Sequence, residues 1–208
     1  MELLSRKNQK RINKKEKIMT NIEKSLQNRR TIYSLDKNIK SNEEEITKTI
    51  KNITELTPDA YGIRSQRVVV VFKDDHDKLW DKIGEVFNGK VAEDKINMFK
   101  SGYGTVLYFS DEDTLKKASE DTGTEIERFE HWAAQSIGML ELNIWTALEE
   151  LGLGANIQHY NPVIDDVVKE MFDIPKSWKL DAQMVFGNKT ADPDPKEKED
   201  INNRVIVK

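Results

Sequence analysis

Two arginines and a hydroxyl group stand together in the segment Asn28-Arg29-Arg30-Thr31-Ile32-Tyr33. A guanidinium presents a rigid fork of N–H donors and a threonine hydroxyl adds one more, which suits a phosphate monoester. Adjacent arginines are usually solvated surface charges, so this pair alone does not establish a phosphate site. Arg204, near the C-terminal end, either closes on the same phosphate or is an ordinary surface cation.

A second segment, Gly152–Pro162, combines glycines, amide side chains and aromatic rings in the order GLGANIQHYNP. It is too polar for a core, and we expect a loop that aims backbone amides at a planar heterocycle. Gln158, His159 and Tyr160 are the candidates to line that ring. The competing interpretation is an ordinary helix end followed by a turn.

Other chemistries have no support in the sequence. There is no cysteine, which excludes disulfides, thiolate metal sites and cysteine nucleophiles. Dinucleotide-binding, P-loop, nucleophile-elbow and zinc-protease motifs are absent. The three histidines are scattered, so no metal site is predicted, and His76, among three aspartates, is interpreted as the exposed start of a helix.

Charge and hydropathy place further limits on function. The net charge of -4 gives no general attraction to nucleic acid or anionic membranes. No apolar run approaches the roughly 20 residues that span a bilayer, and no apolar segment of a secretory signal follows the basic N-terminus. We therefore expect a soluble, cytoplasmic protein that binds neither nucleic acid nor membrane.

Residues 1–18 are rich in Lys, Arg, Asn and Gln, and we interpret them as a dispensable, solvated leader. A nucleic-acid-binding or membrane-binding arm is one alternative for this segment. Another is that the natural chain starts at Met19. The remaining residues, 19–208, are expected to form one domain.

Hydrophobic periodicity predicts the elements that position the candidate groups. Residues 68–72, a run of valines, are typical of a strand buried on both faces, and Ser41 is the expected cap of a helix over 42–56. The expected helices begin near residue 20 and cover 42–56, 75–87, 129–151 and 164–172, and the expected strands cover 68–72, 105–109, 179–186 and 205–207.

The helix predicted over 129–151 is apolar around most of its circumference. Such a helix is buried either in a large core or between subunits. In a chain of 208 residues, a subunit interface is the better interpretation, so we expect a homodimer.

Several motifs occur together in an order that resembles the nitroreductase family, specifically its fatty-acid-repression-mutant-like branch. The resemblance covers roughly residues 19–208. The motifs are Arg29-Arg30-Thr31 before Tyr33, Thr57-Pro58 before Arg67 and the valine run, Gly104-Thr105-Val106-Leu107, Trp132-Ala133-Ala134-Gln135-Ser136, Gly138-Met139, Trp145-Thr146-Ala147-Leu148-Glu149, Gly152-Leu153-Gly154-Ala155, Gln158-His159-Tyr160-Asn161-Pro162 and Ser177-Trp178-Lys179-Leu180.

This resemblance implies an α+β fold with a central mixed sheet, flanking helices and a long buried helix at a dimer interface. It implies two FMN sites between the subunits, with Arg29, Thr31 and Arg204 on the phosphate and ribityl end and Arg30 nearby. Gln158, His159 and Tyr160 would line the isoalloxazine, largely through backbone groups. The implied activity is ping-pong reduction of nitroaromatics or quinones by NADH or NADPH, in a stress response. The flavin carries the chemistry, so no catalytic side chain is required.

One segment departs from the family pattern, which continues after Thr-Pro with small hydroxyl residues, Asn and Gln. Here the chain reads Asp59-Ala60-Tyr61-Gly62-Ile63-Arg64, so several expected contacts to flavin are missing. Arg64 is a candidate to compensate by donating to the flavin pyrimidine, and Asp59 is unfavourable near a phosphate unless an arginine pairs with it. The alternative function is therefore a flavin-binding or regulatory protein with little turnover.

Overall fold

A single antiparallel sheet organises the chain in the computed structural model, which describes residues 19–197 and 199–208. The strand order is β1-β5-β3-β2, and β4 also pairs with β5. The α+β class with a central sheet is as predicted, while parallel pairing is confined to an isolated bridge between Thr31 and Ala155. The strands are β1 (Leu35–Asp36), β2 (Gln66–Phe72), β3 (Gly104–Asp111), β4 (Leu153–Gln158) and β5 (Trp178–Lys189).

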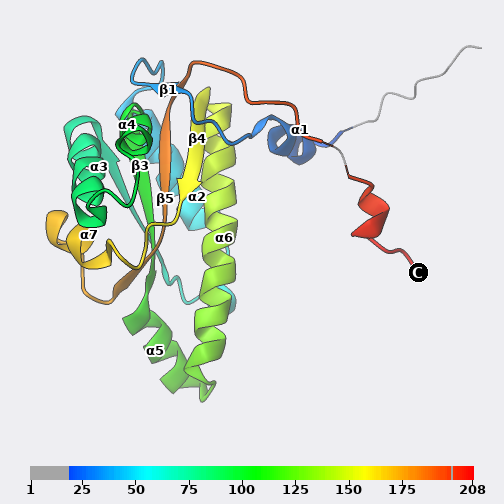
Figure 1. Ribbon diagram of the computed structural model, residues 1–208. Coiled ribbons are helices and arrows are strands. Elements are labelled where there is room, and N and C mark those ends of the chain that lie inside the picture. The colour runs from blue at the N-terminus through cyan, green and yellow to red at the C-terminus, as the bar shows by residue number, and fades with distance from the viewer. Residues whose placement is uncertain (1–18, 198) are drawn as a thin grey trace, which may run out of the picture.

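Helices cover both faces of this sheet (Figure 1). One face packs against α3, α4 and α7, and the other against α2 and α6. Neighbouring residues of β3 point to opposite faces, with Leu107 in the first cluster and Val106 in the second. The helices are α1 (Asn21–Asn28), α2 (Glu43–Leu56), α3 (Lys73–Phe87), α4 (Glu93–Lys100), α5 (Glu112–Thr122), α6 (Ile126–Glu150) and α7 (Asp165–Met171), with short 3-10 turns η1 (Ala60–Gly62) and η2 (Ile201–Asn203).

The two valine-rich strands have different environments. The central strand β3 is buried along its whole length, as predicted. The prediction that residues 68–72 are buried on both faces is wrong, because β2 lies at the edge of the strand order and Val68, Val69 and Val70 are only half-buried. A run of valines reports β propensity and does not distinguish an edge strand from a central one.

Side-chain caps begin two of the helices. Thr20 and Glu23 form a reciprocal capping box at α1. Asn42, not Ser41, caps α2, since its side chain accepts from the Glu45 amide. The Ser41 hydroxyl instead donates to the Leu151 carbonyl and ties the start of α2 to the end of α6. Helices α4 and α5 were not predicted, because their charged sequences carry a weak apolar period.

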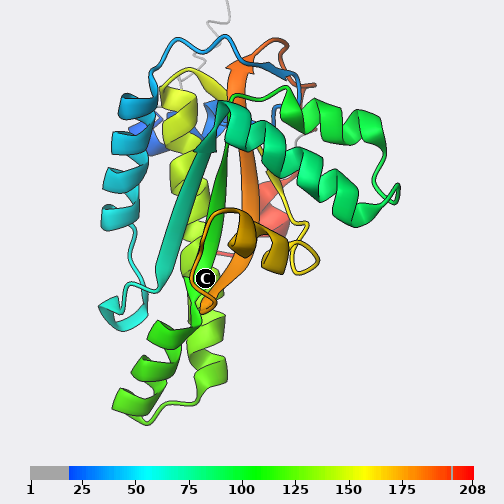
Figure 2. The ribbon, with the colours of Figure 1, turned by 90° about the vertical axis from the view of Figure 1, so that its left-hand side faces the viewer.

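The helices α5 and α6 form a hairpin that extends beyond the end of the sheet (Figure 2). A small core of Leu115, Ala118, Phe129 and Ala133 holds this tip together. At the other end of α6, α1 and the C-terminal segment extend away from the sheet (Figure 1). The expected strand over 205–207 does not form, and these residues are exposed.

Two further expectations concern the N-terminal leader and membrane-spanning helices. The leader over 1–18 lies outside the described residues. Among the described helices, none is both long and apolar enough to cross a membrane.

Candidate functional site

The two segments singled out by their chemistry lie side by side. Thr31 forms a parallel bridge with Ala155, and the Ile32 amide donates to the Ala155 carbonyl at 2.9 Å. The Asn156 side chain donates back to the Ile32 carbonyl at 2.8 Å. Gly154 permits this approach, since a Cβ there would stand 2.9 Å from the Leu35 side chain and 3.0 Å from that of Ile32. The fold therefore joins the Arg29–Thr31 segment to the Gly152–Pro162 segment.

The predicted loop over 152–162 is wrong in its first half, which is the strand β4. Asn156 is only 1% exposed, yet its amide is satisfied, because it donates to Ile32 and accepts from the Gln158 side chain at 2.8 Å. A buried amide is acceptable in a sheet when its hydrogen bonds are made. Composition alone does not reveal these hydrogen-bond partners, so the polar residues of this segment were interpreted as a loop.

Arg29 and Arg30 point to different partners. The Arg29 guanidinium lies 4.3 Å from the centre of the Trp145 ring on α6, a cation–π contact. Its Nε is buried and has no hydrogen-bond partner among the described residues. Burial, and then repulsion from Arg30, lower the pKa of Arg29. Arg30 donates to the Asp194 carbonyl, and Thr31 is exposed beside it.

A cavity of about 320 Å³ opens next to these residues. Arg30, Trp145 and the glycine-containing turn 152–154 contribute to its wall. Lys189 and two carboxylates, Glu149 and Asp192, also line it. Lys189 neutralises Asp192 at 2.8 Å, while burial and the neighbouring Glu150 raise the pKa of Glu149. The Lys189–Asp192 pair reduces the negative charge that an anion in this cavity would meet.

The residues that follow β4 divide their roles between side chain and backbone. Tyr160 turns its ring inward against Trp80, Phe87 and Phe99, with ring centres 5.8, 5.2 and 6.1 Å away. Its amide donates to the Gln183 side chain at 2.8 Å, so Tyr160 anchors the segment. His159, immediately before it, is exposed.

Arg204 lies at the end of η2, on the C-terminal segment that extends away from the sheet (Figure 1). Its ionic contact among the described residues is with Glu199, at 3.7 Å and with both side chains exposed. Within this single chain, the described contacts do not bring Arg204 to Arg29 or Arg30.

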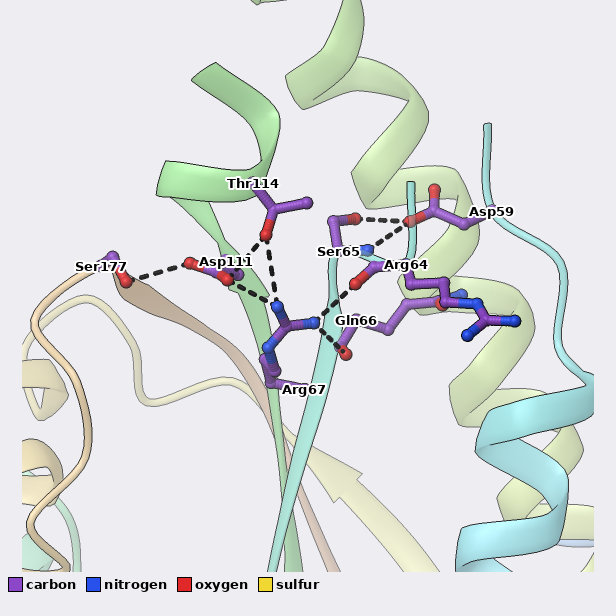
Figure 3. A network of polar contacts seen from close by, with 8 residues as sticks. All are labelled: Asp59, Arg64, Ser65, Gln66, Arg67, Asp111, Thr114 and Ser177. Atoms are coloured by element: carbon purple, nitrogen blue, oxygen red, sulfur yellow. Dashed lines mark hydrogen bonds and ion pairs between the residues drawn. The ribbon is translucent and has the colours of Figure 1, made fainter. Parts of the chain in front are cut away.

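The departing turn, residues 59–65, is held by a polar network (Figure 3). Asp59 does not pair with an arginine: its carboxylate accepts from the Ala60 amide, from the Ser65 amide and hydroxyl, and from the Ser136 hydroxyl of α6, at 2.7–2.9 Å. These neutral donors satisfy the charge that seemed unfavourable in the sequence. Arg64 points outward, with its side chain 80% exposed and 3.4 Å from Glu55.

The other half of this network was not predicted from the sequence. Arg67 donates to the Arg64 carbonyl at 2.6 Å and forms an ion pair with Asp111 at 2.6 Å. Asp111 also accepts from the hydroxyls of Thr114 and Ser177. The network ties the turn to the end of β3. Its members come from three segments that are far apart in the sequence, residues 64–67, 111–114 and 177.

His76 also differs from its sequence-based interpretation, because it is fully buried and not on the surface. Its Nδ1 lies 2.8 Å from the Thr105 hydroxyl and its Nε2 lies 3.1 Å from the Phe99 carbonyl. Burial lowers the pKa of His76 to about 4. The available signal was helical spacing, because His76, Leu79, Trp80 and Ile83 share one face of α3. Among the described residues, no cluster of metal-ligating side chains occurs.

Comparison with known proteins agrees with this architecture. The nitroreductase family model matches residues 26–188. Nitroreductase FRM2 of Saccharomyces cerevisiae is 33% identical over 186 residues, covering 88% of this chain and 94% of the relative. Nitroreductase CinD of Lactococcus lactis, in complex with chloramphenicol, superposes with a TM-score of 0.85 at 39% identity, covering 90% of this chain and 99% of that one.

A more distant structure, an FMN complex from Exiguobacterium sibiricum, has a TM-score of 0.71 at 14% identity over 91% of this chain and 98% of its own. At that identity it shares the fold alone. The resemblance seen in the motifs is thus confirmed by relatives that match most of the chain. This chain belongs to the nitroreductase family and is an oxidoreductase of the nitroreductase type.

Proposed function

We propose that this protein is an FMN-dependent NAD(P)H oxidoreductase that acts as a homodimer on nitroaromatic or quinone-type acceptors. The observation that carries the proposal is the pairing of the Arg29–Thr31 segment with β4. This pairing brings the Arg29–Thr31 segment beside β4, which supports a site where the first segment holds a phosphate and the second faces a planar ring. Family membership and the FMN complex of the same fold support the choice of cofactor.

The residues at the proposed phosphate end fit a phosphate monoester. Arg29 has a buried Nε donor without a partner among the described residues, and a buried unpaired donor is costly unless a ligand satisfies it. Arg30 and Thr31 add donors at the same edge. Among these phosphate-binding candidates, Arg204 is the one that lies away from Arg29 and Arg30 in the single chain. It would join them if the C-terminal segment folds back when phosphate is bound.

At the ring end, we propose that Gln158, His159 and Tyr160 line the isoalloxazine mainly through backbone groups other than the Tyr160 amide, which already donates to Gln183. The inward ring of Tyr160 fixes the path of this segment, and the exposed His159 lies where an amide can face a ligand. The turn 59–65 of the second subunit covers the other side, with Arg64 directed at the flavin pyrimidine. A cation there stabilises the anionic reduced ring.

The proposed dimer accounts for the apolar surface on one side of the molecule. Met139 and Leu142 on α6 are 42% and 40% exposed, and Ile22 and Leu26 on α1 are also exposed. Apolar groups gathered on neighbouring elements mark an interaction surface. A second copy seated against α1 and α6 would bury them and would bring its own turn 59–65 towards the ring.

FMN supplies hydride acceptance from NAD(P)H and electron delivery to the next ligand, so this chain's task is to position both partners in turn. CinD has been captured with chloramphenicol, nicotinic acid and 4-nitrophenol, all of them aromatic, which favours the same class of acceptor here. We place the protein in the reducing cytoplasm, where a chain without cysteines needs no disulfide. The alternative is a flavin-binding regulatory protein, suggested by the altered turn.

The test is the visible spectrum of the purified protein after addition of excess FMN and gel filtration, followed by NADH or NADPH and a nitroaromatic. Retained flavin absorbance that bleaches with the nicotinamide and returns with the acceptor supports the proposal. Retained flavin without turnover favours the regulatory alternative. A protein that does not retain FMN contradicts both.

A further inference from the structure

The turn that departs from the family pattern, residues 59–65, is held rigidly at both ends. Asp59 closes it at one end by accepting from both the amide and the hydroxyl of Ser65, and Ser136 joins it to α6. At the other end, Arg67 holds the Arg64 carbonyl. Ser65, the last residue of the turn, and Gln66 after it are buried, so the backbone between Asp59 and Ser65 has little freedom.

Two side-chain-bearing residues within this turn adopt the left-handed conformation, with φ of 55° at both Tyr61 and Arg64. For residues other than glycine this conformation is strained, and such strain persists where the surrounding structure enforces it, often at ligand sites. Both side chains are largely exposed to solvent. Tyr61 is 71% exposed, and Arg64 is exposed further still.

Tyr61 extends an aromatic surface on the α5–α6 tip. Its ring centre lies 5.8 Å from that of Phe129 and 5.7 Å from that of Trp132, and those two rings are 5.2 Å apart in an edge-on arrangement. Aromatic faces of this kind stack favourably on planar rings. The outer face of Tyr61 is the part of this cluster that remains open.

Arg64, three residues further on, supplies positive charge beside this surface. Its one ionic contact among the described residues is Glu55, at 3.4 Å, with both side chains largely exposed. Exposed pairs of this kind contribute little and exchange readily. A carboxylate on a bound ligand would therefore be able to replace Glu55, and the guanidinium fork matches a carboxylate in geometry.

From these features we infer that Tyr61 and Arg64 form an acceptor subsite selective for planar aromatic compounds that carry a negative charge, such as nitrobenzoates. The inference rests on the proposed function and names its substrate class. Tyr61 stacks on the acceptor's ring. The Arg64 guanidinium, which is directed at the flavin pyrimidine in the proposed dimer, pairs with the acceptor's carboxylate through its remaining N–H donors. The nitro group takes up two electrons and two protons to give a nitroso group and water, while one NAD(P)H is oxidised and supplies the electrons.

The experiment compares 4-nitrobenzoate with neutral 4-nitrobenzyl alcohol, a molecule of similar size, using full-length protein saturated with FMN. The measured quantity is the ratio of kcat/KM for the anionic substrate to that for the neutral one. We expect Arg64→Gln to lower this ratio about tenfold, which corresponds to about 1.4 kcal/mol. Arg64→Lys should retain part of the wild-type preference for the anionic substrate. Added salt should lower the ratio in the wild type and have little effect on it in Arg64→Gln.

Glu55→Gln should change the kcat/KM ratio in the opposite direction. It removes the competing carboxylate and should raise the ratio, an outcome that a purely structural role of Arg64 does not produce. Lys82→Gln, on α3 against the opposite face of the sheet, removes the same unit of charge as Arg64→Gln and should leave the ratio unchanged. An unaltered ratio in Arg64→Gln overturns the inference while leaving the proposed function intact. Absence of turnover with both substrates in the wild type overturns the proposed function as well.

Discussion

The two faces of the sheet are completed to different degrees within one chain. The face covered by α3, α4 and α7 has a closed apolar core: Leu79, Trp80 and Phe99 are fully buried there, and the ring nitrogens of His76 and Trp80 have partners. Beside this core, the buried Tyr160 hydroxyl and one carboxylate oxygen of Asp165 have no hydrogen-bond partner among the described residues. The face covered by α2 and α6 leaves Met139 and Leu142 in solvent. It also leaves the Arg29 Nε, where Arg29 packs on α6, without a partner among the described residues.

This difference separates the part of the molecule that maintains the fold from the part that makes contacts. A closed apolar core maintains the fold, whereas an exposed apolar surface indicates a missing ligand or subunit. Function is therefore expected on the α2–α6 side, and mutations on the two sides should have different consequences.

The largest expected effect on stability comes from the closed face. Trp80→Ala should lower the free energy of unfolding by about 3–5 kcal/mol, because it empties a buried site and removes the hydrogen bond from Nε1 to Thr105. Urea denaturation followed by circular dichroism measures it. A loss below 1 kcal/mol would mean that this face is not the closed core described here.

On the opposite face, Leu142→Glu should separate the subunits and leave each one folded. An unpaired carboxylate in an apolar interface costs several kcal/mol, so the dissociation constant of the dimer should rise by about 100-fold or more. Analytical ultracentrifugation reads the mass, with Lys82→Gln as the control of equal charge change. A Leu142→Glu protein that remains dimeric would remove α6 from the interface.

The closed face should also carry an acid sensitivity through His76. Burial lowers its pKa to about 4 in the folded state, against about 6.5 when unfolded. The unfolded chain therefore binds more protons between these values, and stability falls by about 2–3 kcal/mol as the pH drops from 6.5 to 4. Thermal unfolding of wild type and His76→Gln across this range tests it, and an equal slope in both proteins would exclude His76 as the cause.

Glu141 on α6 should give a smaller dependence of stability on pH, in the opposite direction to that of His76. Burial, and then the charge of Asp181, raise its pKa to about 7, and Asp181 itself has a pKa raised mainly by burial. Here the folded state binds more protons, so stability is lost as the pH rises from about 4.5 to 7. Because Glu141 is only partly buried, the effect should be about 1–2 kcal/mol. Glu141→Gln should be more stable than wild type at pH 8 and equal to it near pH 4, and no gain at pH 8 would contradict the assignment.

The sequence predicts the elements better than their environments. The period of Ile46 and Ile50 and the run at 105–109 identify α2 and β3 directly, because burial of one helix stripe or of a whole strand leaves a local pattern. The edge position of β2 and the strand character of β4 depend on neighbours far away in the chain. No local pattern records those contacts.

The candidate site shows the same division. Arg29, Arg30 and Thr31 are recognisable from residue type, and their proximity to β4 appears only in the fold. The network around Asp59 and Arg67 was not predicted, because hydrogen bonds to Ser136, Asp111 and Ser177 connect segments without any fixed spacing in the sequence. The role of Arg204 in the site remains a prediction, because the described contacts of the single chain do not bring it there.

The most direct measurement of the central claim compares FMN with riboflavin, which lacks the phosphate, in binding to wild-type protein and to Arg29→Gln. Flavin fluorescence quenching gives both dissociation constants. If Arg29 holds the phosphate, the wild type should prefer FMN strongly. Arg29→Gln should then weaken FMN by about 10–100-fold, as expected for a lost charge-assisted hydrogen bond, with little change for riboflavin. Equal binding of the two flavins by the wild type, or an unchanged FMN affinity in Arg29→Gln, would contradict the account.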